Sequence, residues 1–134
     1  MAEPLKKTPL KILIVEDELA MLKLLVITLT DEGFEVVTAM DGVQGLKNAE
    51  VHHPDLILLD IVLPEMDGIT MMKKLRAESE WGKKVPIIIL TNLNADDTIM
   101  KAVTENEPSY YLVKTNWKPD DVVRKVRERL GTAD

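Results

Sequence analysis

The chain has 134 residues, the length of one domain, and 46% of them are hydrophobic, which excludes general disorder. Its net charge of −6 argues against nucleic acid as a direct partner, because binding phosphates requires a basic face. The lack of cysteine excludes disulfides and thiolate metal sites. No apolar run approaches the ~20 residues of a membrane span. Residues 1–7 lack the apolar core of a signal peptide, so we expect a cytoplasmic protein without membrane contact.

Short apolar runs alternate with amphipathic segments along the chain. Residues 12–15 predict a first strand, and the apolar stripe over 18–32 predicts a helix that ends at Gly33. Residues 34–39 are more polar, which indicates an edge strand. Three further apolar runs without alternation predict strands buried on both faces: 56–59, 87–90 and 111–113.

Capping residues and breaks mark the later helices. We expect one from Asp41 to before Pro54, one from Asp67, one from Asn94 or Asp96 to before Pro108, and one after Pro119 that ends at Gly131.

Five such strand–helix units predict an α/β fold. Crossovers of this length give right-handed parallel connections, so the sheet should be a doubly wound (βα)5 sheet with helices on both faces. Periodicity alone leaves the strand order open. We expect a single domain over residues 11–130, a flexible N-terminal segment over 1–10 and a C-terminal tail over 131–134.

Polar residues follow four of the predicted strands, where parallel strands bring their carboxyl ends to one edge. Glu16 and Asp17 follow the first strand, and Asp60, Thr91 and Lys114 follow later ones. Carboxylates about 5 Å apart repel by roughly 3 kcal/mol per pair at an effective dielectric of about 20, so a cation such as Mg²⁺ is expected. Asp60 is the best placed nucleophile, and the Thr91 hydroxyl and Lys114 ammonium suit an oxyanion. The set predicts metal-assisted phosphoryl transfer to or near an aspartate.

Each of these residues also has an ordinary structural interpretation. The acid pair alone is equally well a helix cap, a hydroxyl at a strand end usually bonds to backbone, and a single lysine usually faces solvent. Their coincidence at four strand ends favours the site.

The chain resembles the receiver domain of two-component response regulators from about Lys11 to Leu130. The motifs that carry the resemblance are Ile-Leu-Ile-Val-Glu-Asp-Glu (12–18), Pro-Asp-Leu-Ile-Leu-Leu-Asp-Ile-Val-Leu-Pro-Glu-Met-Asp-Gly (54–68), Pro-Ile-Ile-Ile-Leu-Thr (86–91) and Tyr-Leu-Val-Lys (111–114).

The resemblance implies a flavodoxin-like sheet with strand order 2-1-3-4-5 and a phosphorylation site. Asp60 would be the phosphoacceptor, and Glu16 and Asp17 would form its acid pocket. The Mg²⁺ ligands would be Asp17, Asp60 and the carbonyl of Val62.

It also implies a switch. Thr91 and Lys114 would contact the phosphoryl group, and Thr91 and Tyr111 would reorient and change the surface of the fourth helix, fifth strand and fifth helix. The donor would be a sensor histidine kinase or a histidine phosphotransfer protein, and the target an unknown downstream protein. Such a domain is a signalling module, not an enzyme, although it assists its own phosphorylation and dephosphorylation. We expect a monomer or weak homodimer.

The sequence departs from the family pattern at several positions. Thr115 follows Lys114 where the family usually has proline, which leaves open whether that peptide bond is cis or trans. Asn92 stands where a small residue is usual, and residues 107–110 replace a pattern with which one subfamily dimerises. Val62 and Leu93 are apolar and cannot position an attacking water, so we expect a long-lived aspartyl phosphate.

Two alternatives use the same fold or nucleophile differently. A pseudo-receiver would bind proteins without phosphorylation, with Asn92 and Thr115 marking an altered pocket. A phosphatase of the haloacid dehalogenase type needs a second acid two residues after the nucleophile, and Val62 argues against it. No output segment follows Leu130, so we expect a stand-alone regulator or an excised receiver.

Overall fold

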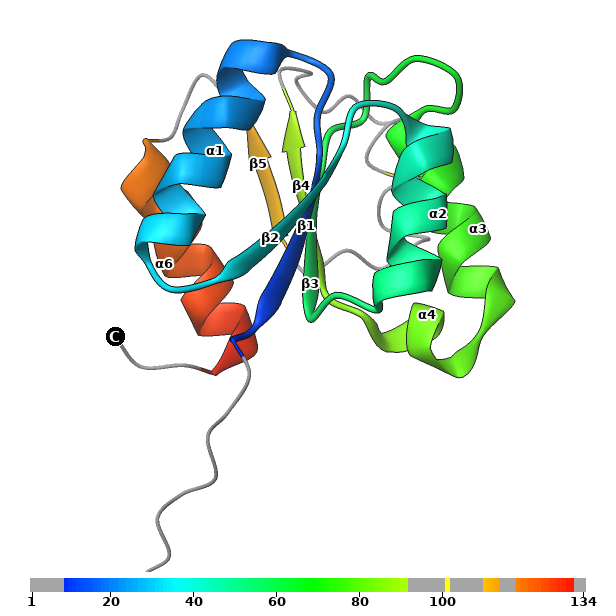
Figure 1. Cartoon of the computed structure of the whole chain (residues 1–134). Coiled ribbons are helices and arrows are strands. Elements are labelled where there is room, and N and C mark those ends of the chain that lie inside the picture. Colours follow the sequence, from blue (N-terminus) through cyan, green and yellow to red (C-terminus); the bar gives the residue numbers. More distant parts are fainter. Residues whose placement is uncertain (1–8, 92–100, 102–109, 114–117, 132–134) are drawn as a thin grey trace, which may run out of the picture.

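The computed structural model describes residues 9–91, 101, 110–113 and 118–131 (Figure 1). Their strands form one parallel sheet in the order β2-β1-β3-β4-β5. The order implied by the resemblance is therefore confirmed. The strands are β1 (Lys11–Val15), β2 (Glu35–Ala39), β3 (Leu56–Leu59), β4 (Ile87–Thr91) and β5 (Tyr110–Val113).

Helices cover both faces of this sheet (Figure 1). One face carries α1 (Leu19–Asp31) and α6 (Pro119–Leu130), and the other carries α2 (Gly42–His52), α3 (Gly68–Glu78) and the short α4 (Glu80–Lys84). The helix predicted from Asn94 or Asp96 lies outside the described residues. Among the helices that the structure describes, none combines the length and apolar character that a membrane span requires.

The central strands are apolar because both of their faces are covered. No residue of 12–15, 56–59 or 87–90 is more than 3% exposed. Successive side chains point to opposite faces, so each run supplies two separate cores. In β1, Leu13 and Val15 belong to the core under α2 and α3, whereas Ile12 and Ile14 belong to the core under α1 and α6.

The polar strand β2 lies at the edge, as its composition predicts. The side chains of Glu35 and Thr38 are exposed, and β2 pairs with β1 along one side only. The side-chain amide of Asn48 in α2 donates to the Thr38 carbonyl at 2.9 Å. An acceptor on β2 is thus satisfied by a side chain.

Most predicted helix ends are found within a residue or two. Asp41 accepts a hydrogen bond from Gln44 N at 2.7 Å at the start of α2, and Asp67 accepts one from Thr70 N at 2.9 Å at the start of α3. Gly131, with φ of +72°, ends α6.

The helix α4 was not predicted, because five residues are too few to show a helical period. Ser79 Oγ accepts a hydrogen bond from Gly82 N at 2.9 Å at its start. The Arg76 guanidinium donates to the carbonyls of Gly82 at 2.8 Å and Val85 at 2.7 Å. These bonds fix the connection from α3 to β4.

Candidate functional site

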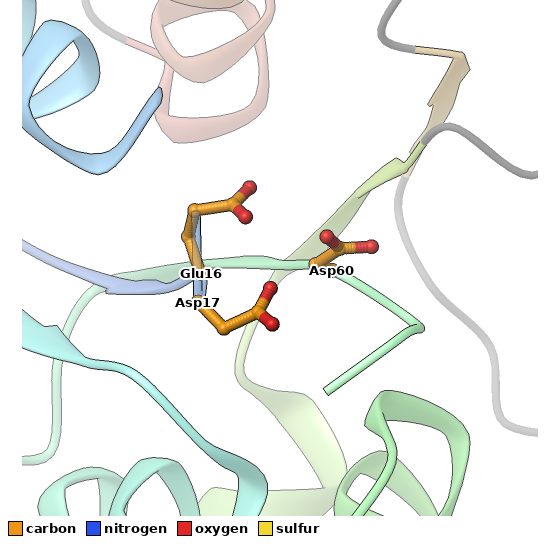
Figure 2. A group of neighbouring side chains, drawn as sticks. All are labelled: Glu16, Asp17 and Asp60. Carbon is orange, nitrogen blue, oxygen red and sulfur yellow. The ribbon is translucent and has the colours of Figure 1, made fainter. Parts of the chain in front are cut away.

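Three carboxylates lie together at the carboxyl edge of the sheet (Figure 2). Glu16 and Asp17 follow β1, and Asp60 follows β3. One oxygen from each lies within 4.8 Å of the others. The pairing of Val15 with Leu59 explains this meeting, because the residues that follow two paired parallel positions emerge side by side. The structure thus brings together three of the residues predicted for the site.

The two acids after β1 differ in burial. Glu16 is 2% exposed, and its backbone N–H donates to the Ala39 carbonyl at 3.0 Å. Its carboxylate accepts a hydrogen bond from the Glu18 backbone N–H at 3.0 Å. Asp17 is exposed. The pair therefore offers one buried carboxylate fixed by backbone and one that faces solvent.

Asp60 is held by backbone on both sides. Its N–H donates to the Val15 carbonyl at 3.1 Å, and its carboxylate oxygen Oδ1 accepts from the Val62 N–H at 3.2 Å. The residue is 6% exposed, whereas Val62 beside it is 56% exposed. The carboxylate therefore has a set orientation at the surface end of a buried strand.

The donor set fits a hard divalent cation. Carboxylate oxygens make up the cluster, and two of its three residues, Glu16 and Asp60, are buried. Like charges this close repel strongly where water is scarce, and a cation removes that cost. Mg²⁺ prefers such oxygen ligands and keeps several waters, which the exposed side of Asp17 permits.

The remaining predicted site residues are described to different extents. Thr91 ends β4 and is fully buried, and because Ile89 pairs with Leu59 it lies at the same edge as Asp60. Tyr111 lies in β5 opposite Ile89, and only its backbone is described. Lys114 lies outside the described residues, as do Asn92 and Thr115. Their predicted roles remain predictions.

One contact at the site was not anticipated. Gly42, the first residue of α2, lies against the segment between β3 and α3, and its N–H donates to the Pro64 carbonyl at 3.3 Å. In the sequence, the glycine after Asp41 is the only sign of this contact, because the contact joins segments that are distant along the chain.

A parallel sheet in this order, with carboxylates converging after β1 and β3, defines a receiver domain. The chain belongs to the response regulator receiver domain family, whose model matches residues 12–127. The predicted family and fold class are therefore confirmed.

Known relatives agree with this assignment. The DNA-binding response regulator MtrA of Mycobacterium tuberculosis is 37% identical over 124 residues, covering 92% of this chain and 52% of MtrA. The chain spans about half the length of the curated relatives it matches. The receiver domain of the sensor histidine kinase PA1611 from Pseudomonas aeruginosa, which has a magnesium ion in its active site cleft, is 31% identical with a TM-score of 0.82. That match covers 93% of this chain and all of the other. The BeF3-activated receiver domain of RstA from Klebsiella pneumoniae is also 31% identical, with a TM-score of 0.79, over 90% of this chain and 97% of the other.

Proposed function

We propose that this chain is the phosphoacceptor of a two-component phosphorelay, with Asp60 as the acceptor residue. The observation that carries the proposal is the convergence of Asp60 with Glu16 and Asp17 within 4.8 Å at the carboxyl edge of a receiver fold. In the reaction, a carboxylate oxygen of Asp60 attacks the phosphorus of a phosphohistidine. A P–O bond forms, the P–N bond breaks, and the imidazole that leaves takes a proton from solvent.

The acid cluster would hold Mg²⁺ through Asp17, Asp60 and the Val62 carbonyl, with Glu16 completing the pocket. The magnesium ion in the PA1611 receiver domain supports this assignment. When bound, Mg²⁺ neutralises the carboxylates and the phosphoryl oxygens so that the two can approach. The backbone bond from Val62 N to Asp60 Oδ1 orients the nucleophile before the donor arrives.

The switch would follow from the new phosphate. The Thr91 hydroxyl and the Lys114 ammonium contact phosphoryl oxygens, and Tyr111 reorients with Thr91. The surface of the segment after β4, of β5 and of α6 then changes, because the phosphorylated carboxylate stabilises one of two conformations.

The partners follow from this chemistry. The donor is a sensor histidine kinase or a histidine phosphotransfer protein, and the target is a downstream protein. We propose a cytoplasmic signalling module, not an enzyme, that is a monomer or weak homodimer. MtrA is a DNA-binding regulator. For the receiver itself we propose no direct contact with nucleic acid, because its net charge is −6.

Intact-mass measurement after incubation with acetyl phosphate tests this proposal. The wild type should gain one phosphoryl group when Mg²⁺ is present and none in EDTA. Asp60→Asn should gain none, whereas Asp31→Asn, which removes an exposed carboxylate from the end of α1, should behave as the wild type does.

An adduct on Asp60→Asn would overturn the site assignment. If neither acetyl phosphate, phosphoramidate nor a phosphorylated histidine kinase labels the wild type, the proposal fails and the result favours the alternative of a pseudo-receiver.

A further inference from the structure

The segment between β3 and α3 contains a strained turn next to the acid cluster. Met66 N–H donates to the Pro64 carbonyl at 2.7 Å, and Glu65 between them has φ of +69°. This is a γ-turn with a positive φ at its centre, a rare conformation that costs a non-glycine residue free energy. Such a turn persists only where its surroundings hold it in place.

Two glycines supply those surroundings: Gly68, which directly follows the segment, and Gly42, which lies in α2. A Cβ added to Gly68, the first residue of α3, would overlap the Asp60 carbonyl oxygen and lie 2.9 Å from Ile61 Cα. A Cβ added to Gly42 would overlap the Met66 carbonyl oxygen and lie 2.6 Å from the Met66 carbonyl carbon. These neighbours are backbone atoms, so they cannot swing aside as the end of a side chain can.

Gly42 differs from Gly68 because it belongs to another part of the chain. Its N–H is one of the four at the start of a helix that have no partner within the helix, and it donates to the Pro64 carbonyl at 3.3 Å. The same carbonyl accepts from Met66 within the γ-turn. The first turn of α2 thus holds the γ-turn directly.

The γ-turn also limits the position of the short segment that connects it to Asp60. Only Ile61, Val62 and Leu63 separate Asp60 from Pro64, and the Val62 N–H already donates to the Asp60 carboxylate. A shift of the turn away from α2 would therefore move the backbone of Val62 relative to Asp60.

We propose that Gly42 is a positioning residue for the Mg²⁺ site, because its lack of a side chain lets α2 hold the γ-turn that fixes the backbone of Val62 next to Asp60. This inference rests on the proposed function, in which Val62 and Asp60 are ligands of the ion.

A matched pair of glycine variants tests the proposal. Gly42→Ala adds a methyl group against the backbone of the γ-turn. Gly45→Ala adds the same group in the same helix, where it meets side-chain atoms of Met71 and Val15 at 2.9 Å. The Mg²⁺ dissociation constant is measured by amide chemical shifts in NMR titrations, and the free energy of unfolding by urea in EDTA.

We expect Gly42→Ala to weaken Mg²⁺ binding at least tenfold. Gly45→Ala should alter stability and leave the Mg²⁺ dissociation constant within twofold of the wild type. A Gly42→Ala protein that is folded and binds Mg²⁺ within twofold of the wild type would overturn the proposal. A wild type that binds no Mg²⁺ at all would overturn the proposed metal site and this inference with it.

A second variant covers the case in which Gly42→Ala does not fold. Glu65→Gly removes the strain of the positive φ and lets the turn move, so Gly42→Ala/Glu65→Gly should fold. Compared with Glu65→Gly alone, this double variant should still bind Mg²⁺ at least tenfold more weakly. Equal affinity in the two proteins would overturn the proposal.

Discussion

Charged side chains have different roles at the amino edge and at the carboxyl edge of the sheet. At the amino edge they bond to backbone: Asp55 accepts from Lys11 N at 2.7 Å, and Arg76 donates to two carbonyls in the connection to β4. At the carboxyl edge, Glu16, Asp17 and Asp60 gather within 4.8 Å of one another. The first arrangement completes the hydrogen bonding of the fold. The second concentrates like charge, which costs folding free energy and is suited to a cation. Removing the Arg76 guanidinium at the amino edge and removing the Asp60 charge at the carboxyl edge should therefore have opposite effects on stability.

The largest change in stability is expected at the amino edge. Arg76→Met keeps the length of the half-buried side chain and leaves the Gly82 and Val85 carbonyls without their charged donor. We expect the free energy of unfolding in urea to fall by about 2–4 kcal/mol, with no change in Mg²⁺ affinity. Arg124→Met, which removes an exposed ion pair with Asp121, should cost less than about 0.5 kcal/mol. Equal losses from the two variants would contradict the role assigned to Arg76.

A gain in stability is expected at the carboxyl edge. Asp60→Asn removes one charge of the cluster and keeps an oxygen that accepts from Val62 N–H. In EDTA the free energy of unfolding should rise by about 1–3 kcal/mol, because fewer carboxylates repel. The stabilisation of the wild type by Mg²⁺ should vanish in this variant. Asp31→Asn is the control for loss of a carboxylate elsewhere, and a less stable Asp60→Asn protein would show that the cluster is not under repulsion.

A third prediction concerns the carboxyl edge after phosphorylation, namely how long the aspartyl phosphate lasts. Val62 is exposed beside Asp60, and its side chain has no group that binds water. Provided that Asp60 is the phosphoacceptor, Val62→Asn should accelerate the decay of the phosphoryl adduct about tenfold, a difference of about 1.4 kcal/mol in the barrier. Val51→Asn replaces another exposed valine, at the far end of α2, and should leave the decay unchanged. A wild-type half-life of seconds with Mg²⁺ would refute the long lifetime that we predict.

The smallest effect concerns two carboxyl groups near the amino edge. Glu50 in α2 is hydrogen-bonded to Glu78 at the end of α3, and this bond, which requires a proton, raises the pKa of Glu50. A raised pKa in the folded state gives stability that is full below the ordinary pKa and is lost as the pH rises through the raised value. The wild type should therefore gain stability relative to Glu50→Gln on acidification and be the less stable of the two at neutral pH. Both groups are largely exposed, so the difference in the free energy of unfolding, measured in urea at each pH, should stay below about 0.5 kcal/mol. A difference that does not vary with pH would exclude the shared proton.

The sequence predicts those parts of the molecule that depend on local pattern. Runs such as Leu56–Leu59 are buried on both faces, so their composition alone identifies strands, and the parallel order then brings Asp60 beside Glu16 and Asp17. Contacts between distant backbones leave no such pattern. The approach of Gly42 to Met66 depends on where a helix and a turn meet. The helix α4 depends on the bond that Arg76 donates to the Gly82 carbonyl and on the bond that Ser79 accepts from the Gly82 N–H.

The side-chain amide of Asn48, which donates to the outermost strand β2, affects how that strand can pair with another chain. Carbonyls alternate in direction along a strand, and the Ala39 carbonyl faces β1, where it accepts from Glu16 N. The neighbouring Thr38 carbonyl therefore faces outward, where an incoming strand of another chain would seek it. Because Asn48 occupies that acceptor at 2.9 Å, β2 offers one acceptor fewer for intermolecular pairing. An uncharged side chain thus covers part of an exposed strand edge, a role usually assigned to charged residues.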